Sequence, residues 1–132
     1  MRAGRIILAA AAVGGLATCD YFLPERGGAY IQGGDAMRGF ALLETGAHGC
    51  QSCHAIPGIR APRGVVGPPL AGMARRGFIS GQLPNRTGVM VAFLRDPARL
   101  LPQTGMPDTH LTLDQARDMA AFLYTLEDPD AR

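Results

Sequence analysis

Apolar residues recur at helical spacing in three stretches of the chain, and each stretch is bounded by residues that commonly begin or end helices. The first stretch begins at Asp35, a favourable N-cap, and runs to Glu44, with Gly46 as its expected stop. Its apolar face consists of Met37, Phe40 and Ala41, broadened by Leu42 and Leu43. The pattern predicts a short amphipathic helix over 35–44.

The second and third stretches show the same periodicity. Asn85 to Asp96 ends against Pro97, because a proline disfavours helical geometry in the residue before it. The last stretch begins at Thr112 and Gln115, which fit a capping box. The apolar positions are Val89, Met90, Phe93 and Leu94 in the second stretch, and Ala116, Met119, Ala120, Phe122, Leu123 and Leu126 in the last. No stretch alternates as a strand would, so the predicted fold class is all-α.

Long loops are expected between these helices. Glycine and proline recur every few residues from Gly49 to Pro84, and again from Leu100 to Leu111. The chain of 132 residues has 18 glycines and 10 prolines, and no tryptophan. A structureless loop of that length is uncommon inside a domain and is usually functional or wrapped around something. A large flat cofactor would supply such a centre.

The N-terminal residues have the features of an export signal. Arg2 and Arg5 precede an apolar run, Ile6 to Leu16. This run is shorter than the roughly 20 residues of a membrane span. Cys19 follows in a sequence that resembles a bacterial lipoprotein box, and Asp20 resembles the inner-membrane retention signal of such lipoproteins. Lipidation of Cys19 would supply the several acyl chains that stable anchoring needs. The alternatives are an uncleaved anchor or a discarded signal peptide, in which Cys19 is an ordinary small apolar residue.

These features divide the chain into three parts. We expect a leader or N-terminal anchor over 1–19, a flexible glycine-rich tether over 20–34, and one folded domain over 35–128. The formal net charge is +2, and without Arg2 and Arg5 the remaining 11 basic residues match 11 acidic ones. A folded part so close to neutrality does not predict nucleic acid as a partner.

Residues 50–54 read Cys-Gln-Ser-Cys-His, a C-x-x-C-H motif, which is the attachment signature of a c-type haem. Two thiols three positions apart on one turn can reach two vinyl groups along one edge of the macrocycle, and the histidine that follows is directed to the iron as its proximal ligand. Haem attachment of this kind takes place outside the cytoplasm, in agreement with the export signal. We therefore expect one covalent haem c, with its iron, held by Cys50, Cys53 and His54.

Other chemistries also use pairs of cysteines. A dithiol redox motif belongs with an α/β pattern, which this chain lacks, and a structural disulfide would not explain His54. A zinc site would need further ligands, and those remaining are His48, His110 and Cys19.

Over residues 35–127 the chain resembles the class I cytochromes c, small monohaem proteins with a histidine and a methionine as axial ligands. The resemblance rests on the C-x-x-C-H motif and on residues 67–70, Gly-Pro-Pro-Leu, which are similar to that family's loop after the motif. It implies three to five short helices with long loops wrapped around one haem. It also implies a hydrogen bond from the proximal histidine to the carbonyl of Pro68, which would hold the ring and raise its basicity.

The resemblance places the second iron ligand in a loop just before the last helix, where Met106 stands between a glycine and a proline. Met90 and Met119 lie on apolar helix faces and are better explained as core residues. Met73 follows the loop of Pro68 so closely that little chain is available to cross to the other face of the haem. Met106 is therefore the expected sixth ligand.

Two histidines lie outside the motif. His110 is the rival sixth ligand, because imidazole also binds iron. A His/Met pair raises the reduction potential and a bis-His pair lowers it, so this choice decides which partners are thermodynamically accessible. His48, two residues before Cys50, is expected to be solvated or bonded to a loop.

Class I cytochromes c bury the haem propionates against polar side chains. By position, the matching residues here are Arg76 and Asn85, with Arg75 as the alternative to Arg76. A buried propionate without a partner would be costly. Phe93 stands where the family often has a tryptophan, and phenylalanine cannot donate a hydrogen bond. The family's close crossing of the first and last helices has its counterpart in Gly39, Leu123 and Tyr124.

The resemblance implies single-electron transfer on the haem, between a respiratory donor complex or dehydrogenase and a terminal acceptor such as cytochrome c oxidase. The protein would act as a shuttle or as a subunit of such a complex, at the periplasmic face of the bacterial inner membrane, attached through its N-terminal anchor. A six-coordinate iron has no open position, so we expect no small-molecule substrate and no enzymatic activity. The alternative is a haem enzyme or gas sensor with an open sixth site, which requires that Met106 does not bind iron.

If Cys19 is lipidated, the mature protein should partition with membranes, and Cys19→Ser should release it or leave the leader uncleaved. Membrane fractionation and mass spectrometry of the N-terminus measure these outcomes. A wild-type protein that is wholly soluble and begins within residues 9–18 would contradict the lipoprotein hypothesis.

Overall fold

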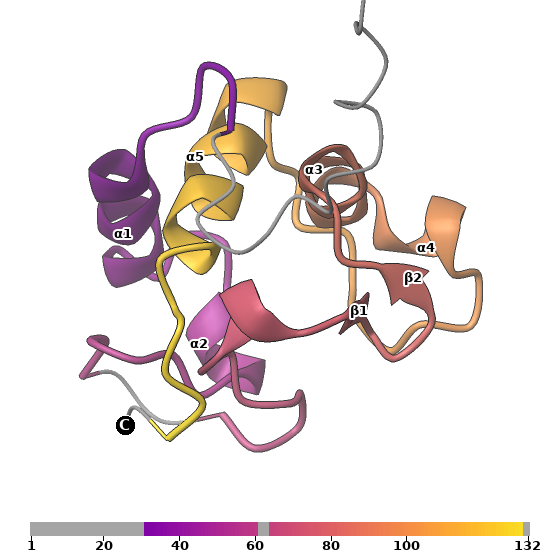
Figure 1. Ribbon diagram of the computed structural model, residues 1–132, viewed down its shortest axis with the longest axis horizontal. Coiled ribbons are helices and arrows are strands. Elements are labelled where there is room, and N and C mark those ends of the chain that lie inside the picture. Colours follow the sequence, from indigo (N-terminus) through magenta and orange to yellow (C-terminus); the bar gives the residue numbers. More distant parts are fainter. Residues whose placement is uncertain (1–30, 61–63, 131–132) are drawn as a thin grey trace, which may run out of the picture.

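Helices make up most of the regular structure in the computed structural model, which describes residues 31–60 and 64–130 (Figure 1). The α-helices of this part are α1 (Ala36–Glu44), α2 (Cys50–Cys53), α3 (Thr87–Arg95), α4 (Pro97–Leu100) and α5 (Leu113–Leu123). A 3-10 turn, η2 (Met73–Arg75), and two short strands, β1 (Phe78–Ile79) and β2 (Leu83–Pro84), lie between α2 and α3. The strands are antiparallel, with Phe78 opposite Pro84. The all-α fold class is confirmed.

The start of the folded part differs from the prediction. The leader over 1–19, with Cys19, and residues 20–30 of the predicted tether lie outside the described residues. The end of that tether is packed: Ile31 is buried, and the backbone N–H of Gly34 donates to its carbonyl at 2.9 Å. The folded part therefore includes Ile31, ahead of the predicted boundary at 35, because this branched apolar side chain joins the core. In the described part, no helix combines the length and the apolar composition of a membrane span.

Helix α1 begins at the predicted cap, and the predicted apolar face is buried only in part. The carboxylate of Asp35 accepts the backbone N–H groups of Met37 and Arg38. Gly39 and Leu43 are buried, whereas Met37, expected on the buried face, is 76% exposed. Side-chain hydrophobicity places Met37 on the buried face, but the approach of another helix decides what is buried here. Gly39, which the family resemblance assigns to the helix crossing, is buried because its missing side chain lets the other helix approach closely.

The closest approach of α1 to α5 is at Gly39. A Cβ atom at this position would collide with the main-chain carbonyl of Asp118 and lie 3.0 Å from Cβ of Phe122, so only glycine fits. Leu123 and Tyr124, the expected partners in this crossing, are buried, but the contact itself lies N-terminal to them on α5. The crossing anticipated at Gly39 is thus present, with different partners.

The sequence pattern does not predict the short elements. The predicted loop over 49–84 contains α2, η2, β1 and β2, each of which is too short to show a full hydrophobic period. The pattern also does not predict helix α4, because in it Pro97 marks only the end of α3. It is also the first residue of α4, whose N-cap Asp96 accepts the backbone N–H of Arg99 at 3.0 Å. A capping residue followed by proline was the available signal.

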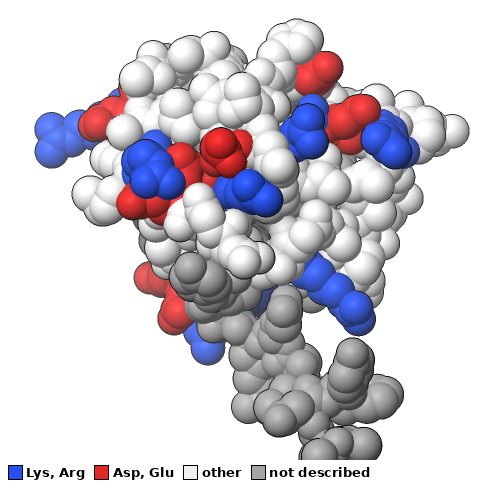
Figure 2. Space-filling model, turned by 90° about the horizontal axis from the view of Figure 1, so that it is seen from above, with Lys and Arg blue, Asp and Glu red and all other residues white. Residues whose placement is uncertain are grey.

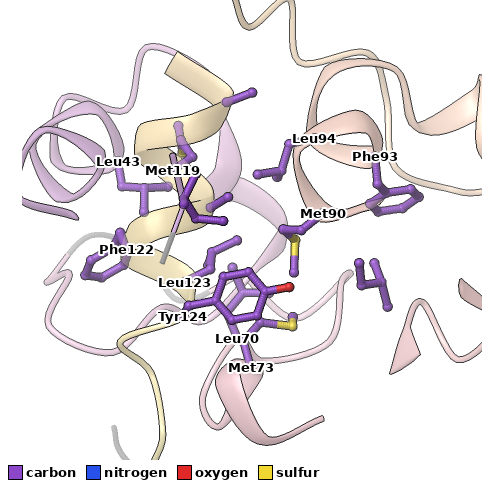
Figure 3. Close-up of a cluster of buried hydrophobic side chains, with 14 of the residues drawn as sticks. Leu43, Leu70, Met73, Met90, Phe93, Leu94, Met119, Phe122, Leu123 and Tyr124 are labelled. Atoms are coloured by element: carbon purple, nitrogen blue, oxygen red, sulfur yellow. The ribbon is translucent and has the colours of Figure 1, made fainter. Parts of the chain in front are cut away.

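The hydrophobic core draws mainly on α3, α5 and the segments between α2 and α3, with Leu43 from α1 (Figure 3). Met90 and Met119 are 2% and 1% exposed, as expected of core residues. The capping box at Thr112 and Gln115 is present, and the predicted stripe of α5 is buried behind it. The rings of Phe40 and Phe122 extend the core to the α1–α5 contact, with centroids 5.5 Å apart.

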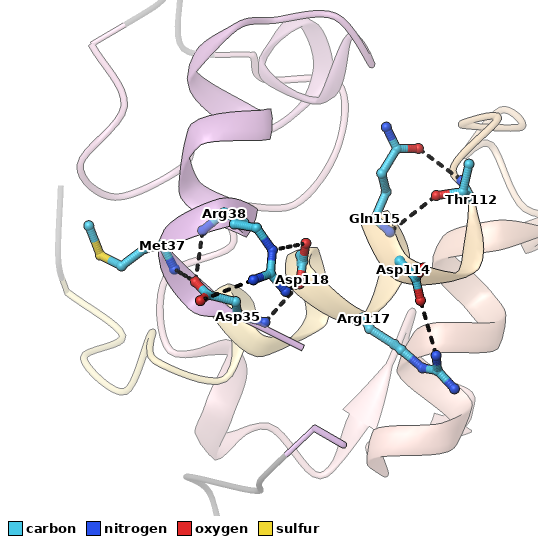
Figure 4. A network of polar contacts seen from close by, with 8 residues as sticks. All are labelled: Asp35, Met37, Arg38, Thr112, Asp114, Gln115, Arg117 and Asp118. Atoms are coloured by element: carbon cyan, nitrogen blue, oxygen red, sulfur yellow. Dashed lines mark hydrogen bonds and ion pairs between the residues drawn. The ribbon is translucent and has the colours of Figure 1, made fainter. Parts of the chain in front are cut away.

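A buried carboxylate links α1 to α5 (Figure 4). Asp118 accepts hydrogen bonds from Nε and Nη2 of Arg38, both at 2.8 Å, and from the backbone N–H of Asp35 at 2.8 Å. The hydrogen bonding by Arg38 is the largest cause that holds the pKa of Asp118 below its ordinary value, and burial opposes it. The first turn of α1 is thereby tied to the middle of α5.

Asp118→Asn should destabilise the fold more than Asp114→Asn, a matched change at an exposed residue of the same helix. The pKa of Asp118 is lower in the folded chain than in the unfolded one, where it is about 3.9. Its stabilising effect is therefore complete above that value and is lost as the pH falls through the folded-state pKa. Melting temperatures of wild type and Asp118→Asn should differ at neutral pH and converge in acid. A difference that does not change with pH would contradict this account.

Candidate functional site

The C-x-x-C-H motif forms the single turn α2. Gly49 enters the turn with a φ of 66°, a left-handed conformation that favours glycine. The backbone N–H of His54 donates to the carbonyl of Cys50 at 2.9 Å, and His54 leaves the turn in an extended conformation. Cys50 and Cys53 carry free thiols and are half-buried, and burial raises the pKa of Cys50. The motif therefore has the one-turn geometry expected of it.

A second segment, residues 64–70, runs alongside this turn. The backbone N–H groups of Gly64, Gly67 and Leu70 donate to the carbonyls of Gln51, Cys53 and Ala55, at 3.1, 2.8 and 2.9 Å respectively. The approach is so close that a Cβ atom at Gly64 would collide with the backbone of Cys53. The segment therefore takes its position directly from the motif.

His54 is bonded through one ring nitrogen. Its Nδ1 atom lies 2.7 Å from the carbonyl oxygen of Pro68. Because a carbonyl can only accept, the proton of the neutral ring is on Nδ1, and Nε2 keeps its lone pair. A histidine that binds a metal through Nε2 needs this tautomer. The contact is the one that the resemblance implied for Pro68.

Gly67 lies directly against the ring of His54. A Cβ atom at Gly67 would be 2.5 Å from Cε1 and 2.7 Å from Nδ1, so any other residue would displace the ring or the segment. Together with the bond to Pro68, this contact restricts the orientation of the imidazole.

Arg76, expected to meet a haem propionate, supports the segment that contains Pro68. Its Nη2 atom donates to the carbonyls of Pro69 at 2.5 Å and Ala71 at 3.0 Å. A propionate contact would use the other N–H groups of the guanidinium, on Nε and Nη1. Arg75, the alternative, is exposed at the end of η2. The propionate role of Arg76 stays a prediction.

Asn85 connects η2 to the end of α5. Its Nδ2 atom donates to the carbonyls of Met73 and Arg76, each at 2.8 Å, and its Oδ1 atom accepts from the hydroxyl of Tyr124 at 2.8 Å. Both amide hydrogens are thus directed at main-chain carbonyls. A propionate contact at Asn85, which also stays a prediction, would have to take one of them.

Met106 lies in the loop between α4 and α5, and this loop is held by its own side chains. The backbone N–H of Met106 donates to Oγ1 of Thr104 at 3.2 Å, and the side chain packs half-buried against the hydrophobic core. The hydroxyl of Thr109 donates to the carbonyl of Leu94 in α3 at 2.5 Å. The methionine is therefore supported by a restrained backbone.

His110, the rival ligand, is directed into solvent. Its side chain is 85% exposed and its Nδ1 atom lies 3.5 Å from a carboxylate oxygen of Asp108. The backbone N–H of His110 donates to the same carboxylate at 2.8 Å, and its φ is 52°. To bind iron in the interior, this ring would have to leave solvent and change the end of the loop.

His48 is bonded to a loop, and this loop is the one that carries Met106. Its Nδ1 atom lies 3.1 Å from the carbonyl oxygen of Thr109 and so donates to it. The contact joins the motif segment to the Met106 loop across 61 residues of sequence. The sequence left His48 open between solvent and a loop, and no sequence signal points to Thr109, because its main-chain carbonyl is the acceptor.

A family model of cytochrome c matches residues 36–127 of the chain. No curated protein matches the chain. The matched span contains the motif turn, the Pro68 segment and the Met106 loop, and the chain belongs to the cytochrome c family, with the class I fold. Members of this family hold a covalent haem c with its iron and transfer electrons with it.

The residues found here fit a haem c. They provide two thiols at the required spacing and a histidine whose tautomer leaves Nε2 able to bind iron. The zinc alternative would need more ligands. Over 31–60 and 64–130, no three His, Cys, Asp or Glu side chains are grouped so as to hold a metal ion.

Gly67→Ala should lower the yield of haem-loaded protein severalfold, because the added methyl group displaces the His54 ring from the Pro68 carbonyl. Gly77→Ala is the matched control, since a Cβ atom at Gly77 meets nothing within 4 Å. The ratio of haem absorbance to total protein measures the effect. A Gly67→Ala protein with the wild-type ratio and spectrum would show that the close approach is not required.

Proposed function

We propose that this protein is an exported, membrane-tethered carrier of single electrons, with His54 and Met106 as the axial ligands of its haem iron. The observation that carries the proposal is the hydrogen bond from Nδ1 of His54 to the carbonyl of Pro68. This bond leaves the lone pair of Nε2 free to bind iron. Cys50 and Cys53 would hold the haem through thioether bonds.

The bound haem supplies the one-electron couple of its iron. The residues of the chain adjust the energy of that couple. The carbonyl of Pro68 raises the basicity of His54, and the thioether of Met106 favours the ferrous state, which raises the potential. The hydrogen bonds of Thr104 and Thr109 restrain the loop that carries Met106.

The burial of the two candidate residues supports Met106 over His110 as the sixth ligand. Met106 packs against the core from a loop that precedes α5, whereas the ring of His110 is 85% exposed. A side chain that binds a buried iron must itself be buried, and the side chain of Met106 is already partly buried. With both axial positions filled by protein, the site would carry electrons without binding a substrate.

The surface beside the motif supports the proposal that a redox partner binds there transiently. Val65 and Val66 are 90% and 84% exposed, next to Gly64, which packs against the backbone of Cys53. Exposed apolar side chains beside the point of haem attachment suit a small, short-lived interface. The face seen in Figure 2, viewed from above Figure 1, carries interspersed basic and acidic side chains and lies away from α2. The partners we propose are a respiratory donor complex or dehydrogenase and a terminal oxidase.

The proposed location is the periplasmic face of a bacterial inner membrane. The cationic start of the chain, the apolar run after it and Cys19 support export and anchoring. The C-x-x-C-H motif supports it as well, because haem is attached to this motif outside the cytoplasm. An anchor would raise the effective concentration of the carrier near partners in the same membrane.

Met106→Ala should retain haem and most of its helix content, because the two thioethers and His54 still hold the macrocycle. The ferric protein should lose the weak long-wavelength band of methionine ligation, and the ferrous protein should bind carbon monoxide. The reduction potential should fall, since the thioether no longer favours the ferrous state. Optical spectra in both oxidation states and a redox titration measure these effects.

His110→Asn is the control, because asparagine tolerates the left-handed backbone found at this position. It should leave the band, the potential and the response to carbon monoxide as in wild type. If His110→Asn opens the iron and Met106→Ala does not, the ligand assignment is wrong. A wild-type protein that already binds carbon monoxide would point to a haem enzyme or gas sensor.

A further inference from the structure

His48 and Thr109 form a connection between the two segments that carry the proposed axial ligands. His48 lies just before α2, in the segment that leads to Cys50 and His54, and Thr109 lies in the loop after Met106. The hydrogen bond from Nδ1 of His48 to the carbonyl of Thr109 is 3.1 Å long.

Thr109 is held from a second side as well. Its residue is 8% exposed, and its hydroxyl donates to the carbonyl of Leu94 at 2.5 Å. The main chain of Thr109 is thus bonded to the motif segment and its side chain to α3. Met106 is three residues away in the sequence, so movement of Thr109 would move the methionine.

The rest of the loop is held only locally by the bonds described above. Thr104 bonds to the backbone of Met106, and Asp108 bonds to the backbone of His110. These bonds shape the loop but do not attach it to the remainder of the fold. Thr109 attaches the loop to the remainder of the fold, together with the apolar packing of Met106 and of Leu111, which is buried in the core.

We propose that His48 is a positioning residue for the sixth iron ligand: by holding Thr109, it keeps the Met106 thioether on the iron and closes the sixth site to external ligands. This inference rests on the proposed function, because it requires that Met106 binds the iron. An external ligand binds in proportion to the fraction of molecules in which Met106 has left the iron. Loss of the His48 bond should increase that fraction.

The test is a titration of the ferric holoprotein with imidazole, followed by loss of the long-wavelength band. His48→Phe keeps a ring but removes the donor, and it should bind imidazole about fivefold more tightly than wild type, the factor expected for one net hydrogen bond. His48→Asn places an amide N–H near the position of Nδ1, and it should restore an affinity close to wild type. His110→Asn should have no effect.

A second pair of variants tests whether Thr109 positions the Met106 loop, through the other hydrogen bond that Thr109 makes. Thr109→Val removes the hydroxyl that bonds to Leu94 and should also tighten imidazole binding, whereas Thr109→Ser keeps the hydroxyl and should not. If His48→Phe fails to mature, His48→Leu, which also lacks the donor, takes its place in the imidazole titration.

The results separate the proposal from the function on which it rests. Wild-type ferric protein without the long-wavelength band would overturn the ligation by Met106, and the proposed function with it. If the band is present and His48→Phe lowers the melting temperature but leaves imidazole affinity unchanged, His48 has only a structural role and this proposal is overturned. Equal tightening in His48→Phe and His48→Asn would also overturn it, because the donor would then not be the cause.

Discussion

A histidine that binds iron must keep one ring nitrogen unprotonated. A hydrogen-bond acceptor at the other nitrogen fixes the proton there and so decides which nitrogen can bind the metal. In this protein the carbonyl of Pro68 accepts a hydrogen bond of 2.7 Å from Nδ1 of His54, which keeps the proton on Nδ1. The acceptor is in place because residues 64–70 pair with the backbone of the motif turn, and because Arg76 donates to the nearby carbonyls of Pro69 and Ala71. The haem site depends on this arrangement of main-chain carbonyls.

The packing of α1 on α5 provides the frame for these segments. Gly39 lets the two helices approach closely, main chain to main chain. At the same crossing, the buried carboxylate of Asp118 makes an ionic contact with the partly exposed side chain of Arg38. From the end of α5, the hydroxyl of Tyr124 reaches Asn85, which in turn holds both ends of η2. The segments around the site are therefore joined to the helices by polar contacts of single side chains as well as by the core.

The elements that the sequence predicted correctly are those governed by neighbouring residues. The caps at Asp35 and Thr112 and the stripe of α5 depend on contacts within a few positions, and each is present. The errors arose where a local pattern competes with tertiary contact. The buried face of α1 follows Gly39 rather than Met37, and Ile31 joins the core instead of remaining in a tether.

The sequence by itself determined the haem chemistry, because a C-x-x-C-H motif needs only one turn of backbone and a short-range order of residues. It also indicated the all-α class, through periodicity and capping. Only the tertiary structure decided what Arg76, Asn85 and His48 contact, since all three donate to main-chain carbonyls. Every residue offers such a carbonyl, so side-chain identity does not mark the acceptor. The meeting of His48 with Thr109, 61 residues away, is set by how the loops fold over the helices and is not encoded in any local pattern.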